Sequence, residues 1–600
     1  MSLDEFREPF DLVVAGTGVA QSVLAGAAAR IGKRVLHLDA NSHYGGPWAS
    51  LPFPELSRTM STTGSDHGGE VGHGDESGDR SQMAETEGMD KGSAAALEAL
   101  GVDGCSMMAR AGIGHARAVV VDAAAVADFA LPQNARKFNV DLGNKVIPAR
   151  GSLVADLISS DALLYSDGAF RAVPCSKADI FADPYVKALE KRKLMKFLKP
   201  YAPQDLSTAT SVDAAGHSPT ADGAKADDGT LDEALDAARM SGKLAAFVKY
   251  AIALVERDEP PLSKAAGEAA IRLYLHSLGR YGKTAFLAPM YGMSEIGQAF
   301  CRLCAVFGGF YVLSWPLTRW YLAPGTGCAV GVGTEAGVVL RAAHFVVGPE
   351  YLPSAMVART EARVARAIVV ARRSLVADAK LAVASIPPRA VADNPNPVYV
   401  VQVDDSTESC PPGFCVVQMS MALPADGSAN DGREVMEHVV AHFYDVTPVV
   451  AEVEAETEAE AETEAEAETE AEAETEAEAE TEAEAGASTD TSAKPKAVWY
   501  CTFAQVERVI DGAARDVPSN ITVVPDVSGG LCAEDVMAQA RSMFESLFPG
   551  EEYLPKMPTP EEYEWAGAGD ANDNADGNGA DPTTAEPNTA EPTTAEPAAS

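Results

Sequence analysis

Residues 10–51 read FDLVVAGTGVAQSVLAGAAARIGKRVLHLDANSHYGGPWASL, and this stretch decides the fold. An apolar run at Phe10–Ala15 leads into a glycine-containing turn, and a small-residue helix pattern follows at Ala20–Ile31. A second apolar run, Arg34–Leu38, ends on an aspartate. This order predicts the strand, turn, helix and strand that open a dinucleotide-binding βαβ unit.

The glycine turn carries only part of the dinucleotide fingerprint. Gly16 permits a tight turn, and Gly18 lets the backbone approach whatever lies at the helix N-terminus. The third glycine of the pattern is replaced by Gln21, which crowds the volume beside a pyrophosphate. Asp39 stands where an acidic residue would bind a ribose hydroxyl. The broken motif favours a fold that kept the scaffold and lost the ligand, so we expect no cofactor.

Length and charge bound the class of protein. The 600 residues predict two packed domains plus additional segments. The net charge is −41, and the 17 glutamates of the Ala/Glu tract Ala451–Glu484 contribute −17 of it. So acidic a chain argues against nucleic-acid binding and against stable docking on anionic lipid.

The cysteines and the chain ends predict a reduced, cytoplasmic protein. Nine cysteines show no disulfide framework and no zinc-ligand spacing, so we expect no metal site. Cys301 and Cys304 fall inside a helical pattern, where thiols three residues apart are usually small buried side chains. The sequence shows no signal peptide, no apolar run long enough for a membrane span and no C-terminal prenylation cysteine.

The middle of the chain predicts a helical module inserted into an α/β domain. Leu153, Leu157 and Ile158 fit an amphipathic helix entering it. Thr230 and Glu233 form a capping box, and Lys243–Val255 is a nearly all-apolar helix pattern.

The resulting fold class is α/β (α+β), with an FAD/NAD(P)-binding-like domain, an inserted all-helical domain and several disordered insertions. The expected boundaries are 1–149 plus 281–450 plus 495–565 for the α/β domain, 150–280 for the helical domain, and 59–115, 204–229, 451–494 and 566–600 for low-complexity or disordered segments.

Ser294–Phe307 predicts an amphipathic helix. Ile296, Phe300, Leu303 and Phe307 fall at one helical face and are the expected core stripe. Glu295 and Arg302 are seven residues apart and lie roughly 110° from that stripe, so we expect both to face water or a partner.

Four separated stretches resemble one family, the Rab escort proteins (Rab geranylgeranyltransferase component A) and Rab GDP-dissociation inhibitors. They are Tyr44-Gly45-Gly46, Val173–Phe181 with Glu190–Leu198, Tyr291–Leu313, and Pro518–Asn520 with Ala538–Pro549. The second and fourth are similar to the escort branch in particular. The resemblance implies the flavin-oxidase scaffold without a flavin.

The family resemblance also implies roles for individual residues. Rab GTPases in the GDP form would contact the α/β domain. The residues that match these positions are Tyr44, Glu295, Arg302, Phe310 and Val312. For Glu295 and Arg302 the alternative is an ordinary surface salt bridge of little energetic value.

Two further sites follow from the resemblance. The contact with the geranylgeranyltransferase α/β heterodimer maps onto Phe181 and Arg192, although Phe181 could instead cap the local core. The helical module would receive the geranylgeranyl lipid. The candidate wall consists of Phe247, Tyr250, Ala251 and Leu254, with an ordinary core helix as the alternative.

The sequence therefore predicts a non-catalytic Rab escort protein. It would present newly made, GDP-bound Rab GTPases to the transferase and deliver the prenylated product to membranes in vesicle transport. It would reside in the cytosol with transient membrane contact, and nuclear presence is compatible. The alternatives are a Rab GDP-dissociation inhibitor that recycles prenylated Rabs and an FAD-dependent oxidoreductase of the amine-oxidase scaffold.

Overall fold

The computed structural model describes most of the chain outside its low-complexity segments. The described residues are 6, 8–62, 103–106, 113–129, 131–143, 145–149, 158–166, 169–172, 188–202, 229–278, 285–323, 327–352, 360–376, 379, 381–424, 432–449, 494–509, 517–525 and 530–555. The helices and strands named below all belong to the compact unit Met1–Tyr553. Among the residues described, no helix is both long and apolar enough to cross a bilayer.

The opening stretch forms a strand, a helix and a second strand, as the sequence predicts, and its two strands belong to a five-stranded parallel sheet. Its strand order is β11-β2-β1-β15-β21, and every neighbouring pair runs parallel. The strands are β1 (Phe10–Ala15), β2 (Val35–Leu38), β11 (Phe310–Val312), β15 (Ala342–Val347) and β21 (Ile521–Val523). The strands near the centre are buried on both faces, which explains their continuous apolar runs.

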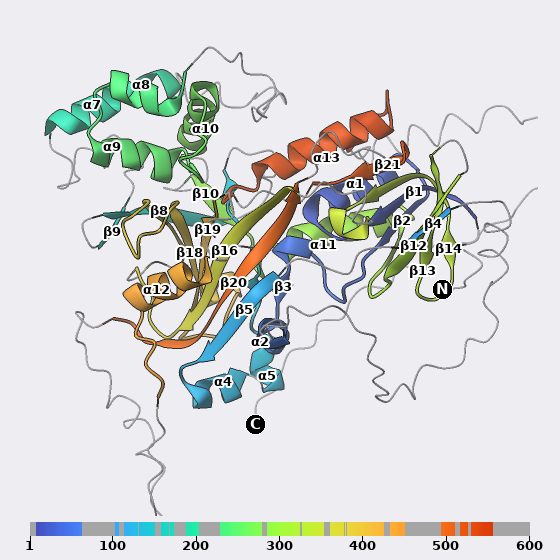
Figure 1. The fold of residues 1–600 in the computed structure, drawn as a ribbon, viewed down its shortest axis with the longest axis horizontal. Coiled ribbons are helices and arrows are strands. Elements are labelled where there is room, and N and C mark those ends of the chain that lie inside the picture. Colours follow the sequence, from blue (N-terminus) through green and yellow to red (C-terminus); the bar gives the residue numbers. More distant parts are fainter. Residues whose placement is uncertain are drawn as a thin grey trace, which may run out of the picture. The chain divides into compact units, whose positions relative to one another are not determined.

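Two layers cover this sheet. Helices α1 (Val19–Arg30) and α11 (Ser294–Val306) pack against one another on one side, and α13 (Glu534–Leu547) packs on α1 (Figure 1). A four-stranded sheet of order β14-β13-β12-β4 shares an apolar core with the parallel sheet. Its strands are β4 (Asp103–Ser106), β12 (Leu317–Leu322), β13 (Ala329–Thr334) and β14 (Val339–Leu340).

A larger, mostly antiparallel sheet of ten strands forms the rest of the α/β part. The path is β5-β20-β16-β19-β18-β17-β8-β10-β7, with β9 paired to β8. The strands are β5 (Ile113–Val120), β7 (Ile147–Pro148), β8 (Ile158–Ser166), β9 (Ala169–Ala172), β10 (Phe286–Ala288), β16 (Thr360–Ala371), β17 (Leu381–Ile386), β18 (Val398–Asp404), β19 (Cys415–Ala422) and β20 (Ala497–Val509).

Helices and short strands cover this larger sheet. Helix α12 (Arg433–Phe443) packs its apolar side on one cluster of sheet residues. A second cluster gathers α2 (Phe53–Thr62), α4 (Ala123–Phe129) and the strand pair β3 (Ser50–Leu51) and β6 (Val140–Asp141). The short helix α5 (Pro132–Ala135) follows α4.

The helical module packs on the same sheet through a third cluster. It contains α7 (Ala188–Leu198), η3 (Lys199–Tyr201), α8 (Leu231–Ala237), α9 (Gly242–Ala246), the π-helix η5 (Phe247–Ile252) and α10 (Lys264–Ser277). The capping box at Thr230 and Glu233 is confirmed, since each side chain bonds the other's backbone. The helix expected over Lys243–Val255 is present over Gly242–Ile252, where α9 continues directly into η5, but it ends before Val255, and Leu254 adopts a φ of +51°.

Two expectations about the inserted segments were also wrong. Ile158 begins strand β8 rather than continuing an amphipathic helix, because β8 pairs with β17 and β10 inside the larger sheet. The segment 59–115, expected to be low in complexity, contributes β4 to the four-stranded sheet. The tracts 204–228, 451–493 and 566–600 lie outside the described residues, and the division into domains stays a prediction.

Candidate functional site

The glycine turn after β1 is closed by Gln21. Gly16 has a φ of +103°, which only glycine adopts easily. A Cβ placed on Gly18 would lie 2.5 Å from Gln21 Oε1, and one placed on Gly16 would lie 3.2 Å from Gln21 Nε2. The Gln21 amide therefore lies over both glycines, where the backbone would approach a pyrophosphate.

Asp39 is saturated by hydrogen bonds from the protein. Its Oδ2 accepts from the Thr17 backbone N–H at 2.7 Å and from the Thr17 hydroxyl at 2.6 Å. Its Oδ1 accepts from the backbone and side chain of Asn41 and from the Tyr351 hydroxyl. Asp39 is also 1% exposed. A carboxylate holding five donors in the interior has no acceptor capacity left for a ribose.

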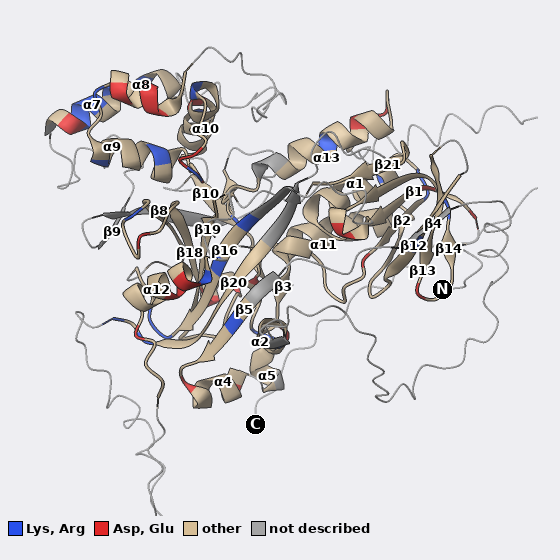
Figure 2. Cartoon of the chain, in the orientation of Figure 1, with Lys and Arg blue, Asp and Glu red and all other residues tan. Residues whose placement is uncertain are grey.

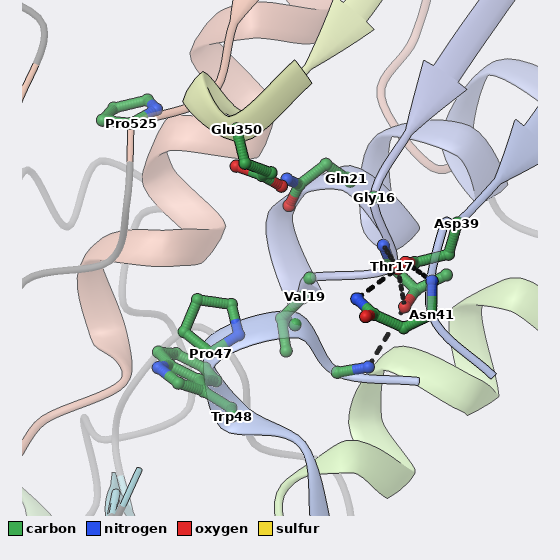
Figure 3. Close-up of a pocket in the computed structure, with 13 residues that line it drawn as sticks. Gly16, Thr17, Val19, Gln21, Asp39, Asn41, Pro47, Trp48, Glu350 and Pro525 are labelled. Carbon is green, nitrogen blue, oxygen red and sulfur yellow. Dashed lines mark hydrogen bonds between the residues drawn. The ribbon is translucent and has the colours of Figure 1, made fainter. Parts of the chain in front are cut away.

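Glu350 adds a negative charge to the same place. Its Oε1 lies 3.5 Å from the position of a Cβ on Gly16, and Figure 3 shows its carboxylate beside the Gln21 amide. The cavity left between these residues and Trp48 measures about 30 Å³, room for roughly one or two water molecules. A flavin pyrophosphate does not fit here, because an amide fills its volume and a carboxylate opposes its charge.

Helix α11 packs closely on α1 through small residues. Its buried positions are Ser294, Gly297, Cys301 and Cys304. A Cβ on Gly297 would lie 3.2 Å from the Thr17 carbonyl oxygen. The expected core stripe of Ile296, Phe300, Leu303 and Phe307 was therefore wrong: these side chains are only half-buried, although Phe300 and Leu303 meet α1 at Gly26.

A histidine–cysteine pair lies under α11. The Cys301 Sγ is 3.7 Å from His37 Nδ1 and 3.5 Å from the Ser22 hydroxyl, while His37 Nε2 is 2.7 Å from the Gly16 carbonyl. Burial alone would raise the pKa of Cys301, but the His37 charge and the hydrogen bonds from His37 and Ser22 lower it. Both residues are buried, so they tie α11 to β2 from beneath.

The outer face of α11 carries Glu295 and Arg302. Both side chains are exposed, as the helical repeat predicts. Among the residues that the structure describes, neither side chain forms a hydrogen bond or an ion pair. The alternative of a salt bridge between them or to the nearby loop therefore finds no support, and both charges remain available to a partner.

Tyr44 lies next to this helix and against Tyr311. Gly45, which follows Tyr44, approaches Ser294 so closely that a Cβ there would lie 3.1 Å from Ser294 Cβ. The rings of Tyr44 and Tyr311 have centroids 6.2 Å apart. Burial and the hydrogen bond with Tyr311 raise the pKa of Tyr44, so its phenol stays protonated.

Phe310 and Val312 face the other way. They are half-buried and pack on the core between the two smaller sheets, where Phe310 meets the rings of Phe6 and Phe10. Alternation along β11 places Tyr311, 41% exposed, on the opposite side. A role in partner binding for Phe310 and Val312 stays a prediction.

Sequence reasoning missed three exposed apolar residues of this region: Tyr291, Tyr311 and Val306. They are 47%, 41% and 70% exposed. The period of two along Phe310–Val312 could have identified Tyr311, and the helical repeat from Glu295 and Arg302 could have identified Val306. We call Tyr44, Tyr291, Glu295, Arg302, Val306 and Tyr311 the platform.

The candidate lipid wall lies in the helical module. Tyr250 and Ala251 are buried in its core, whereas Phe247 and Leu254 are half-buried against it. The Tyr250 hydroxyl donates to Asp258, and Lys249 bridges Asp232 and Asp258 at 2.9 and 2.7 Å. Burial and the Asp258 hydrogen bond raise the pKa of Tyr250.

The candidate transferase contact is only partly visible. Arg192 is exposed on α7, a helix whose Lys and Arg positions are coloured blue in Figure 2. Phe181 lies outside the described residues, so the transferase contact stays a prediction.

Comparison with known proteins agrees with this architecture. The sequence pattern of the GDP dissociation inhibitor family matches residues 6–76 and 130–481, which is more than half of the chain. Rab proteins geranylgeranyltransferase component A 2 of Mus musculus is 25% identical, over 92% of this chain and 98% of that protein. The Rab GDP-dissociation inhibitor of Saccharomyces cerevisiae is 26% identical, over 71% of this chain and 82% of that protein.

A solved structure shows the same fold. The crystal structure of Rab GDI from Plasmodium falciparum superimposes with a TM-score of 0.56 at 16% identity, covering 91% of this chain and 99% of that one. The parallel sheet, the closed glycine turn and the matched sequence ranges lead to one conclusion. This chain belongs to the GDP dissociation inhibitor family.

Proposed function

We propose that this protein is a Rab escort protein. It binds newly synthesised, GDP-bound Rab GTPases, presents them to Rab geranylgeranyltransferase and delivers the prenylated GTPase to membranes. Its work lies in the cytosol, with transient contact at membranes.

The observation that carries the proposal is the exposure of the Glu295 and Arg302 side chains. Two opposite charges stand exposed on one helix, without partners among the described residues, beside the aromatic side chains of Tyr44 and Tyr311. Aromatic residues and arginine are the types that anchor protein interfaces. The platform offers a partner both charge complementarity and apolar area.

Two comparisons favour the escort activity over the runner-up, a GDP-dissociation inhibitor. The mouse relative named as a component of the transferase aligns with 92% of this chain, whereas the yeast dissociation inhibitor aligns with 71%. The escort-like segment around Phe181 and Arg192 also points to a transferase partner. The flavin oxidase alternative loses support, because Gln21, Glu350 and Asp39 use the places that a dinucleotide needs.

The proposed role is not catalytic. The transferase α/β heterodimer would supply the prenyl-transfer chemistry and contact Phe181 and Arg192. The platform would hold the GTPase while its C-terminal cysteines reach the enzyme. Phe310 and Val312 would support the platform from its edge.

The helical module would shield the lipid after transfer. Phe247, Tyr250, Ala251 and Leu254 offer an apolar wall, and a twenty-carbon chain buried at about 0.8 kcal/mol per CH₂ would supply ample affinity. To admit the lipid, this wall has to move away from a neighbouring helix. Phe247, Tyr250 and Ala251 lie on the π-helix η5, and π-helices are irregular elements that are often found at functional sites.

Reconstituted prenylation tests the proposal. A GDP-loaded Rab GTPase, the transferase heterodimer and labelled geranylgeranyl diphosphate are combined with and without this protein. An escort protein makes prenylation depend on its addition. A dissociation inhibitor leaves prenylation unchanged but extracts prenylated Rab from vesicles, so this outcome would select the runner-up. Visible flavin absorption in the purified protein would revive the oxidoreductase.

A further inference from the structure

The N-terminus of helix α11 is capped by the side chains of two residues from a distant part of the chain. The Met293 backbone N–H donates to Asp141 Oδ1 at 2.8 Å, and the Ser294 N–H donates to the Ser50 hydroxyl at 3.0 Å. Ser50 in turn donates to Asp141 Oδ1 and faces it across β3 and β6. The helix has no side-chain cap of its own. Its first free N–H groups are therefore satisfied by a carboxylate and a hydroxyl from the β3–β6 pair.

The turn before the helix, at Tyr291 and Gly292, packs tightly against the two capping side chains. Tyr291 has a φ of +62° and Gly292 a φ of +88°. A Cβ on Gly292 would overlap the Ser50 hydroxyl and the Asp141 carboxylate. Tyr291 is a bulky residue in the left-handed region, which costs roughly 1–3 kcal/mol unless its surroundings fix it. Its N–H donates to the Thr407 carbonyl at 2.9 Å.

The cap is fixed to the larger sheet rather than to α1. Gln418 of β19 donates its side-chain amide to the Asp141 carbonyl at 3.0 Å, and Thr407 follows β18. The middle of α11 instead lies on α1, where Gly297 meets the turn at Thr17. The cap therefore supports the first turn of α11, and α1 supports the middle of the helix.

We propose that Asp141 and Ser50 are positioning residues for the platform. They hold the first turn of α11 in register, so that Tyr291, two residues before Met293, and Glu295, two residues after it, project together toward the GTPase. Asp141 and Ser50 need not touch the GTPase themselves. This inference rests on the proposed function.

The test compares the loss of two helix caps. Asp141→Ala removes the acceptor for the Met293 N–H, Ser50→Ala removes the acceptor for the Ser294 N–H, and Thr230→Ala removes the capping box of α8 in the helical module. Affinity for one GDP-loaded Rab GTPase is measured by calorimetry, together with the thermal midpoint of each variant. We expect affinity to fall about fivefold or more for the two α11 variants, and to stay unchanged for Thr230→Ala at a comparable loss of stability.

Hydrogen exchange separates local from global effects. Amides at Met293–Ile296 should exchange faster in Ser50→Ala, while amides at Leu303–Phe307 keep their protection. Should Asp141→Ala fail to fold, Ser50→Ala still decides, because it keeps the bond between Asp141 and Met293.

Unchanged affinity in folded Ser50→Ala, with exchange at Met293–Ile296 raised, would overturn the inference. If Thr230→Ala weakened binding as much as the α11 variants, the effect would be general destabilisation and the inference would also fail. A wild-type protein that does not bind the GTPase at all would instead refute the proposed function.

Discussion

Tyr44 and Tyr311 lie with their ring centroids 6.2 Å apart and their planes tilted by 52°. One comes from the loop after β2 and the other from β11, which pairs with β2 in parallel. The pair joins the signature loop of the sequence to the edge of the sheet, and it defines the aromatic part of the platform.

The first prediction concerns Tyr311. Tyr311→Ala should weaken binding of a GDP-loaded Rab GTPase by about 1–2 kcal/mol, because an exposed tyrosine braced by a second ring is a typical interface anchor. Calorimetric titration measures this, and Leu131→Ala is the control, since Leu131 is 44% exposed on a different element. Equal effects of the two variants would remove Tyr311 from the platform.

The second prediction concerns the charges on α11. Glu295→Arg and Arg302→Glu should each reduce GTPase binding by about tenfold or more, because each inverts a complementary charge at the interface. Glu335→Arg, on the exposed turn between β13 and β14, makes the same change in net charge as Glu295→Arg and should have little effect. A loss for Glu335→Arg as large as that for Glu295→Arg would point to long-range charge effects, which added salt would screen, and would count against a direct contact at Glu295.

The third prediction concerns the contact between α1 and α11. Gly297→Val should destabilise the protein by about 1–3 kcal/mol, because its side chain would meet the Thr17 carbonyl and push the helices apart. Ala299→Val adds a similar side chain on the exposed face of the same helix and is the control. Urea unfolding compares the two, and equal midpoints would contradict the close packing.

The fourth prediction concerns the ionisation of Asp141. Burial raises its pKa from 3.8 to about 7, against the opposing hydrogen bonds from Ser50 and Met293. The folded state thus binds a proton that the unfolded state releases near its ordinary pKa. This group's contribution to the free energy of unfolding is greatest at low pH and declines as pH rises toward about 7.

Asp141→Asn keeps an acceptor for the Met293 N–H and removes the ionisation. Relative to wild type, the variant should gain stability between about pH 5 and about pH 8. Urea unfolding at both pH values measures the difference. If the free energy of unfolding of the two proteins depended on pH in the same way, the pKa of the Asp141 carboxyl group would not be raised in the folded protein.

The fifth prediction concerns the lipid wall. Leu254→Asn should weaken binding of a fluorescent geranylgeranylated peptide, because it places an amide in an apolar wall. The protein should lose little stability, since Leu254 has a φ of +51°, a conformation that asparagine adopts more readily than leucine. Leu189→Asn, at an exposed position of α7, is the control, and equal lipid affinity in both variants would count against the wall.

The sequence by itself determined the local elements. The apolar runs and glycines of residues 10–51 predicted β1, α1 and β2, and the capping box predicted the start of α8. The helical repeat predicted that Glu295 and Arg302 are exposed, and Gln21 indicated a closed cradle. These features depend on neighbours within a few residues, where propensity and periodicity act.

Only the tertiary structure decided which partners these elements meet. Periodicity gives the spacing of a helix face but not the neighbour that covers it, so Gly297 and Cys301, rather than the larger Phe300, became the buried side of α11. Asp39 is saturated partly by Tyr351, Glu350 reaches the glycine turn, and Asp141 caps a helix that begins about 150 residues later. Long-range contacts of this kind depend on how the sheets pack, and no local pattern in the chain records them.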